Sequence, residues 1–202
     1  MYHEIVPSFI DIPLQFHKNA VLNSQENDIL CEVNTSFFGK SCCYTLETMY
    51  LNNKKCKFYC FDLFNCIPHP IDGEPIRENT PWGENTDSWL SRVGGRHKLI
   101  DAFDFYLENC PFNNLLTSRA QFPSWQAAHE FLDKSIFYCF IRCSESYQHT
   151  RNDLIDWYRK IKTGGTLILF NPNAEALRAI NDIKREFNYE YKYEDNCFIF
   201  TK

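Results

Sequence analysis

The sequence predicts an α/β domain built on a seven-stranded mixed sheet, with helices on both faces and an antiparallel hairpin at its C-terminal end. Two observations predict this class. Short β-branched or aromatic runs alternate with segments whose apolar residues recur at helical spacing, which is typical of βαβ units and a largely parallel sheet. The last two apolar runs are separated only by Asp195–Asn196, so a tight turn must pair them in antiparallel fashion.

The individual elements follow from the same two periodicities. Strands are expected at Ile29–Asn34, Lys57–Leu63, Asn113–Arg119, Ile136–Arg142, Thr166–Asn171, Tyr189–Tyr193 and Cys197–Thr201. Helices are expected at Lys40–Leu51, His97–Asn109, Trp125–Leu132, Arg151–Ile161 and Ala174–Phe187. We expect the strand Ile29–Asn34 to be central and Gly164–Gly165 to end the helix before them.

Length and composition predict one folded domain over residues 1–202. A chain of 202 residues with 44% hydrophobic and 16% aromatic residues can bury one core, which excludes a disordered polymer. Residues 1–28 precede the first strand as an N-terminal extension. Residues 64–95 contain HPIDGEPIRENTPWGEN, which has prolines and glycines but no periodic apolar face, so a long loop or lid is expected there.

Charge and cysteine usage narrow the functional class. There are 26 acidic and 21 basic residues and no basic run, which argues against a nucleic-acid partner. No apolar run approaches the roughly 18 residues of a membrane span, and the N-terminus lacks a basic leader, so a cytoplasmic protein is expected. The ten cysteines lie mostly in predicted strands and helices as reduced thiols, and the spacing of Cys56, Cys60 and Cys66 does not match a zinc site.

Two strand ends carry residues suited to a nucleoside cofactor. The segment ILCEVNTSFFGKS, residues 29–41, is a strand, turn and helix start in which Glu32 is the acidic residue and Gly39 the last glycine. Asp62 ends the next strand, where a carboxylate can accept hydrogen bonds from both ribose hydroxyls. The alternative for Asp62 is a strand-end carboxylate that faces solvent.

The segment Leu115–Asn171, which contains SRAQFPSWQAAHEFLDKSIFYCFIRCSESYQHTRNDLIDWYRKIKTGGTLILFN, carries a family resemblance. It is similar to the sugar and small-molecule O-methyltransferases related to macrocin O-methyltransferase, a subgroup of the class I S-adenosylmethionine-dependent methyltransferases. That subgroup has a Ser-x-x-Ala-Ala helix start, a strand ending in Ile-Asp-Ala-x-His-x-Tyr, a helix with an Asp and a Trp, and Lys-x-Gly-Gly. The matching residues are Ser124, Ala127, Ala128, Ile141, Tyr147, Asp153, Trp157, Lys162, Gly164 and Gly165.

The resemblance, which covers most of residues 29–185, implies a Rossmann-like methyltransferase fold and S-adenosylmethionine as cofactor. It implies methyl transfer to a hydroxyl of a small molecule or sugar. The cofactor contacts it implies are Glu32, Asn34, Gly39 and Asp62, with Ser124 close to the adenine. Asn34 stands where the family generally has its first glycine.

The sequence departs from the family pattern where chemistry would take place. Arg142 replaces an aspartate, Glu145 replaces a histidine, and Phe170-Asn171-Pro172 replaces an acidic group after the fifth strand. In relatives that use a divalent cation those groups are ligands, and a guanidinium would repel the ion, so no metal is expected. Two hypotheses remain for Arg142 and Glu145. They form an ion pair that preserves the loop, or Glu145 acts as general base while Arg142 binds an anionic substrate.

The segment 64–95 supplies three further candidates. His69 is a second candidate base, and Arg77 and Trp82 would shape an acceptor pocket or, alternatively, anchor the loop. The motifs together support two functions. One is an active methyltransferase for a small-molecule or sugar hydroxyl, and the other is a catalytically inactive protein of the same fold with an interaction, regulatory or structural role and a protein partner.

Overall fold

The structure, a computed structural model, describes the chain except residues 7, 9–10, 35–37, 63–98 and 144–145. Its described part contains a seven-stranded sheet in the order β3-β2-β1-β4-β5-β7-β6. The strands are β1 (Ile29–Val33), β2 (Lys57–Phe61), β3 (Leu116–Ala120), β4 (Ile136–Arg142), β5 (Ile161–Phe170), β6 (Lys192–Glu194) and β7 (Cys197–Thr201). The first five pair in parallel and β7 pairs antiparallel with both neighbours, so the predicted mixed sheet is confirmed. The prediction that the first strand is central is wrong by one position, because the middle strand is β4 and β1 lies beside it.

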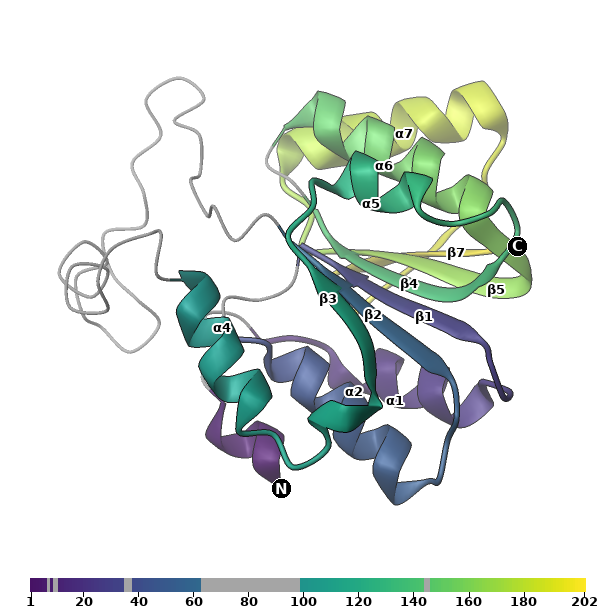
Figure 1. The fold of residues 1–202 in the computed structure, drawn as a ribbon. Helices are drawn as coiled ribbons and strands as arrows, with labels where there is room; N and C mark the ends of the chain where they lie inside the picture. The colour runs from purple at the N-terminus through teal and green to yellow at the C-terminus, as the bar shows by residue number, and fades with distance from the viewer. Residues whose placement is uncertain (7, 9–10, 35–37, 63–98, 144–145) are drawn as a thin grey trace, which may run out of the picture.

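Helices cover both faces of the sheet, as predicted (Figure 1). One face carries α1 (Leu14–Asn23), α2 (Lys40–Leu51) and α4 (Leu99–Glu108), and the other carries α5 (Ser124–His129), α6 (Tyr147–Lys160) and α7 (Ala174–Phe187). Two 3-10 turns, η1 (Tyr2–Ile5) and η3 (Asn113–Leu115), complete the described elements. Each face has its own apolar core, and the chain therefore has the three-layer arrangement of a doubly wound domain.

Residues 1–28, expected as an extension, contribute to the first of these cores. They form η1 and α1, and both elements pack against α2. His17, Ala20 and Val21 of α1 are buried, and the His17 ring lies against Tyr138 and Phe140, so this segment covers part of the sheet face at β4.

The prediction that Gly164–Gly165 ends a helix is wrong. The helix α6 ends at Lys160, and β5 begins at the next residue, five residues before the predicted start at Thr166. The glycines lie inside β5, where its pairing with β4 shifts register between Ile136 and Tyr138. A Cβ on Gly165 would lie 2.8 Å from the carbonyl oxygen of Phe137, so the close approach of the two strands requires glycine here.

The other strands start within a few residues of their predicted bounds. Residues Asn113–Leu115, predicted as strand, form η3, and β6 begins at Lys192 rather than at Tyr189. The tight turn of the hairpin is confirmed, because Asp195 and Asn196 have φ values of 49° and 58°, the pair of positive angles that a two-residue turn of this kind needs.

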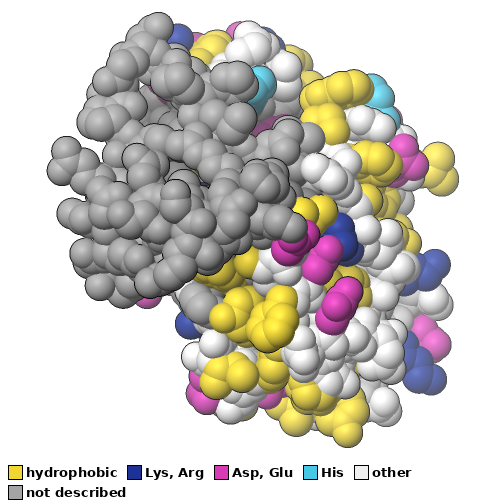
Figure 2. All heavy atoms as spheres, turned by 60° about the vertical axis from the view of Figure 1, so that its left-hand side comes forward, with side chains coloured by type: hydrophobic (Ala, Val, Ile, Leu, Met, Phe, Trp, Pro, Cys, Tyr) yellow, Lys and Arg dark blue, Asp and Glu magenta, His cyan; other side chains and the backbone are white. Residues whose placement is uncertain are grey.

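The charged surface and the length of the helices bear on two kinds of partner, nucleic acids and membranes. Figure 2 shows one face on which the Lys and Arg side chains are scattered singly among hydrophobic, acidic and neutral ones. Within the described ranges, no helix is long and apolar enough to cross a membrane.

Candidate cofactor site

Two buried carboxylates lie at the carboxyl ends of β1 and β2. Glu32 is the next-to-last residue of β1 and Asp62 directly follows β2, and their exposed fractions are 2% and 8%. Because β1 and β2 are parallel, with Glu32 opposite Cys60, both residues are at the same edge of the sheet. The pKa of Glu32 is raised to about 7, mainly by burial, with a smaller rise from the negative charge of Asp62, and a hydrogen bond from Ser41 opposes both effects.

The two oxygens of Glu32 differ in their surroundings. Oε1 accepts a 2.5 Å hydrogen bond from the hydroxyl of Ser41 in the first turn of α2, whereas Oε2 is buried without a partner among the described residues. Glu32 lines a hollow of about 10 Å³, room for roughly one water molecule. The other residues around this hollow are Ile12, Asn34, Ser41, Phe140, Arg142 and Phe170.

Asn34 connects three strand ends. Its φ of 53° is in the left-handed region, which Asn tolerates better than most residues. Its backbone N–H donates to the carbonyl of Phe61 at 2.9 Å, and its side-chain amide donates to the carbonyl of Arg142 at 3.1 Å. Asn34 therefore holds β1, β2 and β4 together.

Gly39 is the residue before α2, and two constraints act on it. Its φ is 70°, a left-handed value that glycine adopts without strain. A Cβ at this position would lie 2.7 Å from Cε2 of Phe103 in α4. The turn that leads into α2 is thus closed against α4, and glycine is required on both counts.

Ser124 is engaged with α6 on the other face of the sheet. Its Oγ accepts a 2.8 Å hydrogen bond from Nε1 of Trp157, and its hydroxyl donates to Asp153. Burial raises the pKa of Asp153 to about 7, although this hydrogen bond opposes the shift. A contact between Ser124 and an adenine stays a prediction.

The residues expected to perform catalysis are only partly described. Arg142 ends β4, half-buried, and lines the hollow beside Glu32. Glu145, His69, Arg77 and Trp82 lie outside the described residues, so the Arg142–Glu145 pair and the acceptor pocket stay predictions. Within the described ranges, no group of three or more His, Cys, Asp or Glu side chains could hold a metal ion.

The sequence did not identify Ser41 as a partner of Glu32. The signal was present, because Ser41 is a polar residue in the first turn of α2, just after the strand that carries Glu32, but the side of the helix that faces β1 is set by packing. A larger hollow, of about 390 Å³, lies elsewhere, where the short α5 leaves β2 and β3 partly uncovered. Its lining is mostly apolar, with Tyr59, Phe61, Phe122 and Phe131 among its residues.

No protein-family model and no curated protein matches the chain. Solved structures do. The O-methyltransferase NovP is 15% identical with a TM-score of 0.57, over 94% of this chain and 78% of NovP. CalS11, a TDP-rhamnose 3′-O-methyltransferase of calicheamicin biosynthesis, is 10% identical with a TM-score of 0.55, over 93% and 77%. An S-adenosylmethionine-dependent O-methyltransferase from Thermotoga maritima is 10% identical with a TM-score of 0.57, over 96% and 67%.

These likenesses concern the fold, because all three identities are low. The chain has the Rossmann-like fold of class I S-adenosylmethionine-dependent methyltransferases, as its sequence resemblance implied. The fold alone does not determine the activity.

Proposed function

We propose that this chain binds S-adenosylmethionine at the carboxyl ends of β1 and β2 and transfers a methyl group to a hydroxyl of a small molecule or sugar. The observation that carries the proposal is the placement of Glu32 and Asp62, two buried carboxylates at adjacent strand ends, beside the glycine turn at Gly39. Open α/β sheets bind ligands at this edge, because loops and helix N-termini converge there.

The residues present fit this cofactor. S-adenosylmethionine supplies a methyl group on a positively charged sulfur, and it also carries an ammonium group and two ribose hydroxyls. Glu32 has a buried oxygen with no partner among the described residues, and this oxygen suits a cationic or hydrogen-donating group. Asp62 is the residue for the ribose hydroxyls, and Gly39 keeps the start of α2 free of a side chain. Ser124 would lie close to the adenine.

The class of acceptor is inferred from the structures with a similar fold and from the positive charge of Arg142. NovP and CalS11 are named as O-methyltransferases, and CalS11 acts on a TDP-linked sugar. Arg142 would bind an anionic part of the acceptor. Glu145 or His69 would accept the proton of the hydroxyl as its oxygen is methylated, with Arg77 and Trp82 contacting the acceptor, and no metal ion would take part.

The cellular location of the protein is also a proposal. The nine described cysteines are free, which supports a reducing compartment, and we assign the protein to the cytoplasm. A nucleic-acid partner is not proposed, because the net charge is −5.

A second candidate is a catalytically inactive protein of this fold with a protein partner. The observation that favours it is Asn34, whose side chain stands in the place of a glycine and is bound to the Arg142 carbonyl. Beside Glu32 only about 10 Å³ is open. Binding of the cofactor would then require these side chains to move.

Calorimetric titration with S-adenosylmethionine and S-adenosylhomocysteine tests both candidates. Wild type should bind both, and Asp62→Ala should weaken binding at least about tenfold, which is about 1.4 kcal/mol. The matched control is Glu26→Ala, because Glu26 is an exposed carboxylate before β1, at the opposite end of that strand. Binding by Asp62→Ala equal to that of wild type would contradict the ribose assignment.

Methyl transfer from labelled cofactor to a panel of hydroxyl acceptors, nucleotide-linked sugars included, separates the two candidates. Turnover supports the enzyme. Binding without turnover across the panel supports the inactive protein, and the absence of binding by wild type contradicts the cofactor site itself.

A further inference from the structure

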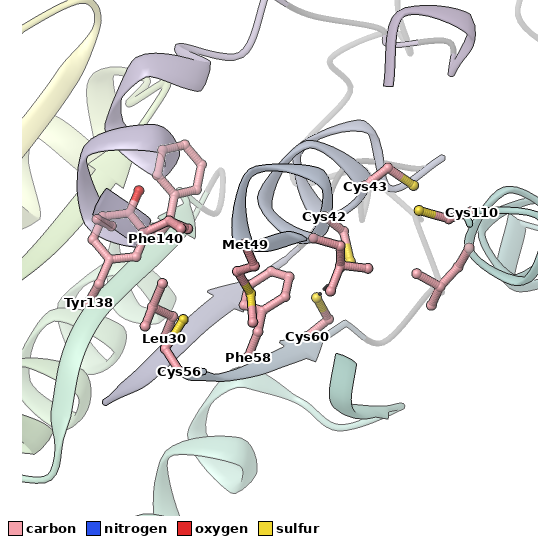
Figure 3. Packing of buried hydrophobic residues seen from close by; sticks show 14 of the residues in the cluster. Leu30, Cys42, Cys43, Met49, Cys56, Phe58, Cys60, Cys110, Tyr138 and Phe140 are labelled. Atoms are coloured by element: carbon pink, nitrogen blue, oxygen red, sulfur yellow. Dashed lines mark hydrogen bonds between the residues drawn. The ribbon is translucent and has the colours of Figure 1, made fainter. Parts of the chain in front are cut away.

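Four cysteine thiols lie together on the α2 side of the sheet, in two pairs (Figure 3). Cys42 and Cys43 are consecutive residues of α2, Cys60 is in β2, and Cys110 follows α4. The Sγ atoms of Cys42 and Cys60 are 3.1 Å apart. Figure 3 shows the sulfur atoms of Cys43 and Cys110 pointing toward each other. The proposed methyl transfer uses none of these thiols.

The Cys42–Cys60 pair has the properties of inert core packing. Both residues are fully buried. Burial raises the pKa of Cys60 to about 11 and that of Cys42 well above its usual value. Both thiols therefore keep their protons, and a protonated thiol is a poor nucleophile.

The Cys43–Cys110 pair is different, because its two sulfur atoms are not equivalent. The contact with the Cys43 thiol, aided by a hydrogen bond from the Phe112 backbone N–H, lowers the pKa of Cys110, although burial opposes this. The same contact raises the pKa of Cys43, which therefore keeps its proton. The Cys43 thiol also donates a long, weak hydrogen bond to the Tyr106 carbonyl oxygen, at 4.0 Å.

A nearby carboxylate and the degree of burial both affect the reactivity of Cys110. The carboxylate of Glu47 acts against the lowered pKa, but it is bound to His3 at 2.8 Å. Cys110 itself is buried, while its chain neighbours Asn109 and Pro111 are exposed. Cys110 thus follows a helix end and lies between two exposed residues, and helix ends open locally more easily than the core.

We propose that Cys43 and Cys110 form a reversible disulfide when the protein meets a peroxide or an oxidised low-molecular-weight disulfide. With hydrogen peroxide, the Cys110 thiolate attacks one oxygen, the O–O bond breaks, and hydroxide leaves, giving a sulfenic acid. The Cys43 sulfur then displaces that hydroxyl, and the S–S bond forms as water leaves with the thiol proton. The two cysteines lose two electrons, and the peroxide is reduced to water.

The bond would tie together the elements around the glycine turn. The Cys43 backbone N–H donates to the Gly39 carbonyl at 2.8 Å, and Phe103 of α4 lies against Gly39. A covalent link between Cys43 and the end of α4 would hold Phe103 in that position. The disulfide itself does not depend on the proposed function, whereas an effect on cofactor affinity does.

The test is oxidation of the folded, full-length, reduced chain with hydrogen peroxide or oxidised glutathione, followed by peptide mapping without reductant. A Cys43–Cys110 linkage that dithiothreitol reverses is expected. Cys110→Ser and Cys43→Ser should abolish it, and the matched controls Cys42→Ser and Cys60→Ser should retain it. Circular dichroism shows whether each variant is folded before it is oxidised.

Thermal unfolding gives a second measurement. The oxidised wild type should melt about 5 °C above the reduced protein, because the link restricts the unfolded chain, and Cys110→Ser should show no such rise. A Cys42–Cys60 linkage in the folded protein, irreversible oxidation of Cys110 alone, or unmodified thiols after treatment would each overturn the proposal.

Discussion

The indole Nε1 of Trp157 donates a 2.8 Å hydrogen bond to Ser124 Oγ, which joins α6 to the first turn of α5. The Ser124 hydroxyl donates in turn to Asp153, one turn before Trp157 on the same helix. All three residues belong to the sequence pattern that resembles the O-methyltransferases. These matched positions therefore form a largely buried polar network between two helices, and a packing role explains their presence as well as a cofactor contact would.

The first prediction concerns this network. Ser124→Ala leaves the Trp157 N–H and the Asp153 carboxyl without a partner in a buried position, so we expect the free energy of unfolding to fall by about 2 kcal/mol. Urea denaturation measures the loss. The control is Ser118→Ala, because Ser118 is exposed on β3, and it should change stability by less than about 0.5 kcal/mol. Unchanged stability with weakened cofactor binding would instead favour the adenine contact.

The second prediction separates backbone strain from steric overlap at Gly39. Gly39→Ala meets both a left-handed φ and the ring of Phe103, so we expect a loss of about 3 kcal/mol in the free energy of unfolding. Gly164→Ala is the matched control, because Gly164 has a φ of 77° and no atom lies within 4 Å of the added Cβ. It should lose only about 1 kcal/mol. Equal losses in chemical denaturation would mean that Phe103 moves aside.

The third prediction is that Glu32 makes the folded state less stable at neutral pH. Its pKa is about 7 in the folded chain, against 4.5 for an unperturbed glutamate, so the folded state holds a proton that the unfolded state releases between these values. Stability conferred by protonated Glu32 is therefore present below pH 4.5 and lost as the pH rises to 7. Glu32→Gln removes this dependence and should be more stable than wild type at pH 8, by up to about 3 kcal/mol.

The same substitution should weaken S-adenosylmethionine binding, because it removes the carboxylate that faces the hollow. Urea denaturation between pH 4.5 and 8 and calorimetric titration at pH 8 check the two effects. Glu26→Gln, at an exposed carboxylate, should change neither of them. A Glu32→Gln protein that is less stable than wild type at pH 8 would show that the carboxylate is paired and ionised in the folded chain.

Elements whose periodicity matched their burial were predictable from sequence. The helices Lys40–Leu51 and Ala174–Phe187 and the strands Ile136–Arg142 and Cys197–Thr201 have the predicted bounds. The failure at Gly164–Gly165 has a physical cause. Two glycines after a helical pattern are typical of a helix end, but here they allow β5 to approach β4, which depends on contacts with a strand far away in sequence. Local pattern cannot contain that information.

In the candidate site, too, some features could be predicted from the sequence and others could not. The placement of Glu32, Asn34, Gly39 and Asp62 at one edge of the sheet could be predicted from sequence, because these residues lie at strand ends or precede a helix and parallel strands bring such positions together. The bond from Ser41 to Glu32 could not, because it depends on the rotation of α2 against the sheet.

The last prediction concerns His17, the buried histidine of α1. Burial lowers its pKa from 6.5 to about 3, so between these values the unfolded state binds a proton that the folded state excludes. Its stabilising effect is therefore present above pH 6.5 and lost as the pH falls, by about 1.4 kcal/mol for each pH unit. In His17→Phe the ring would still pack against Tyr138 and Phe140, whose centroids are 5.7 and 4.5 Å from that of His17. Between pH 6.5 and 5, wild type should lose about 2 kcal/mol more than this variant in urea denaturation.

A constant packing cost cannot imitate this result, because it shifts the whole curve of stability against pH without changing its slope. His129→Gln, at an exposed histidine, should follow the wild-type slope, and parallel curves for wild type and His17→Phe would mean that His17 is protonated in the folded chain.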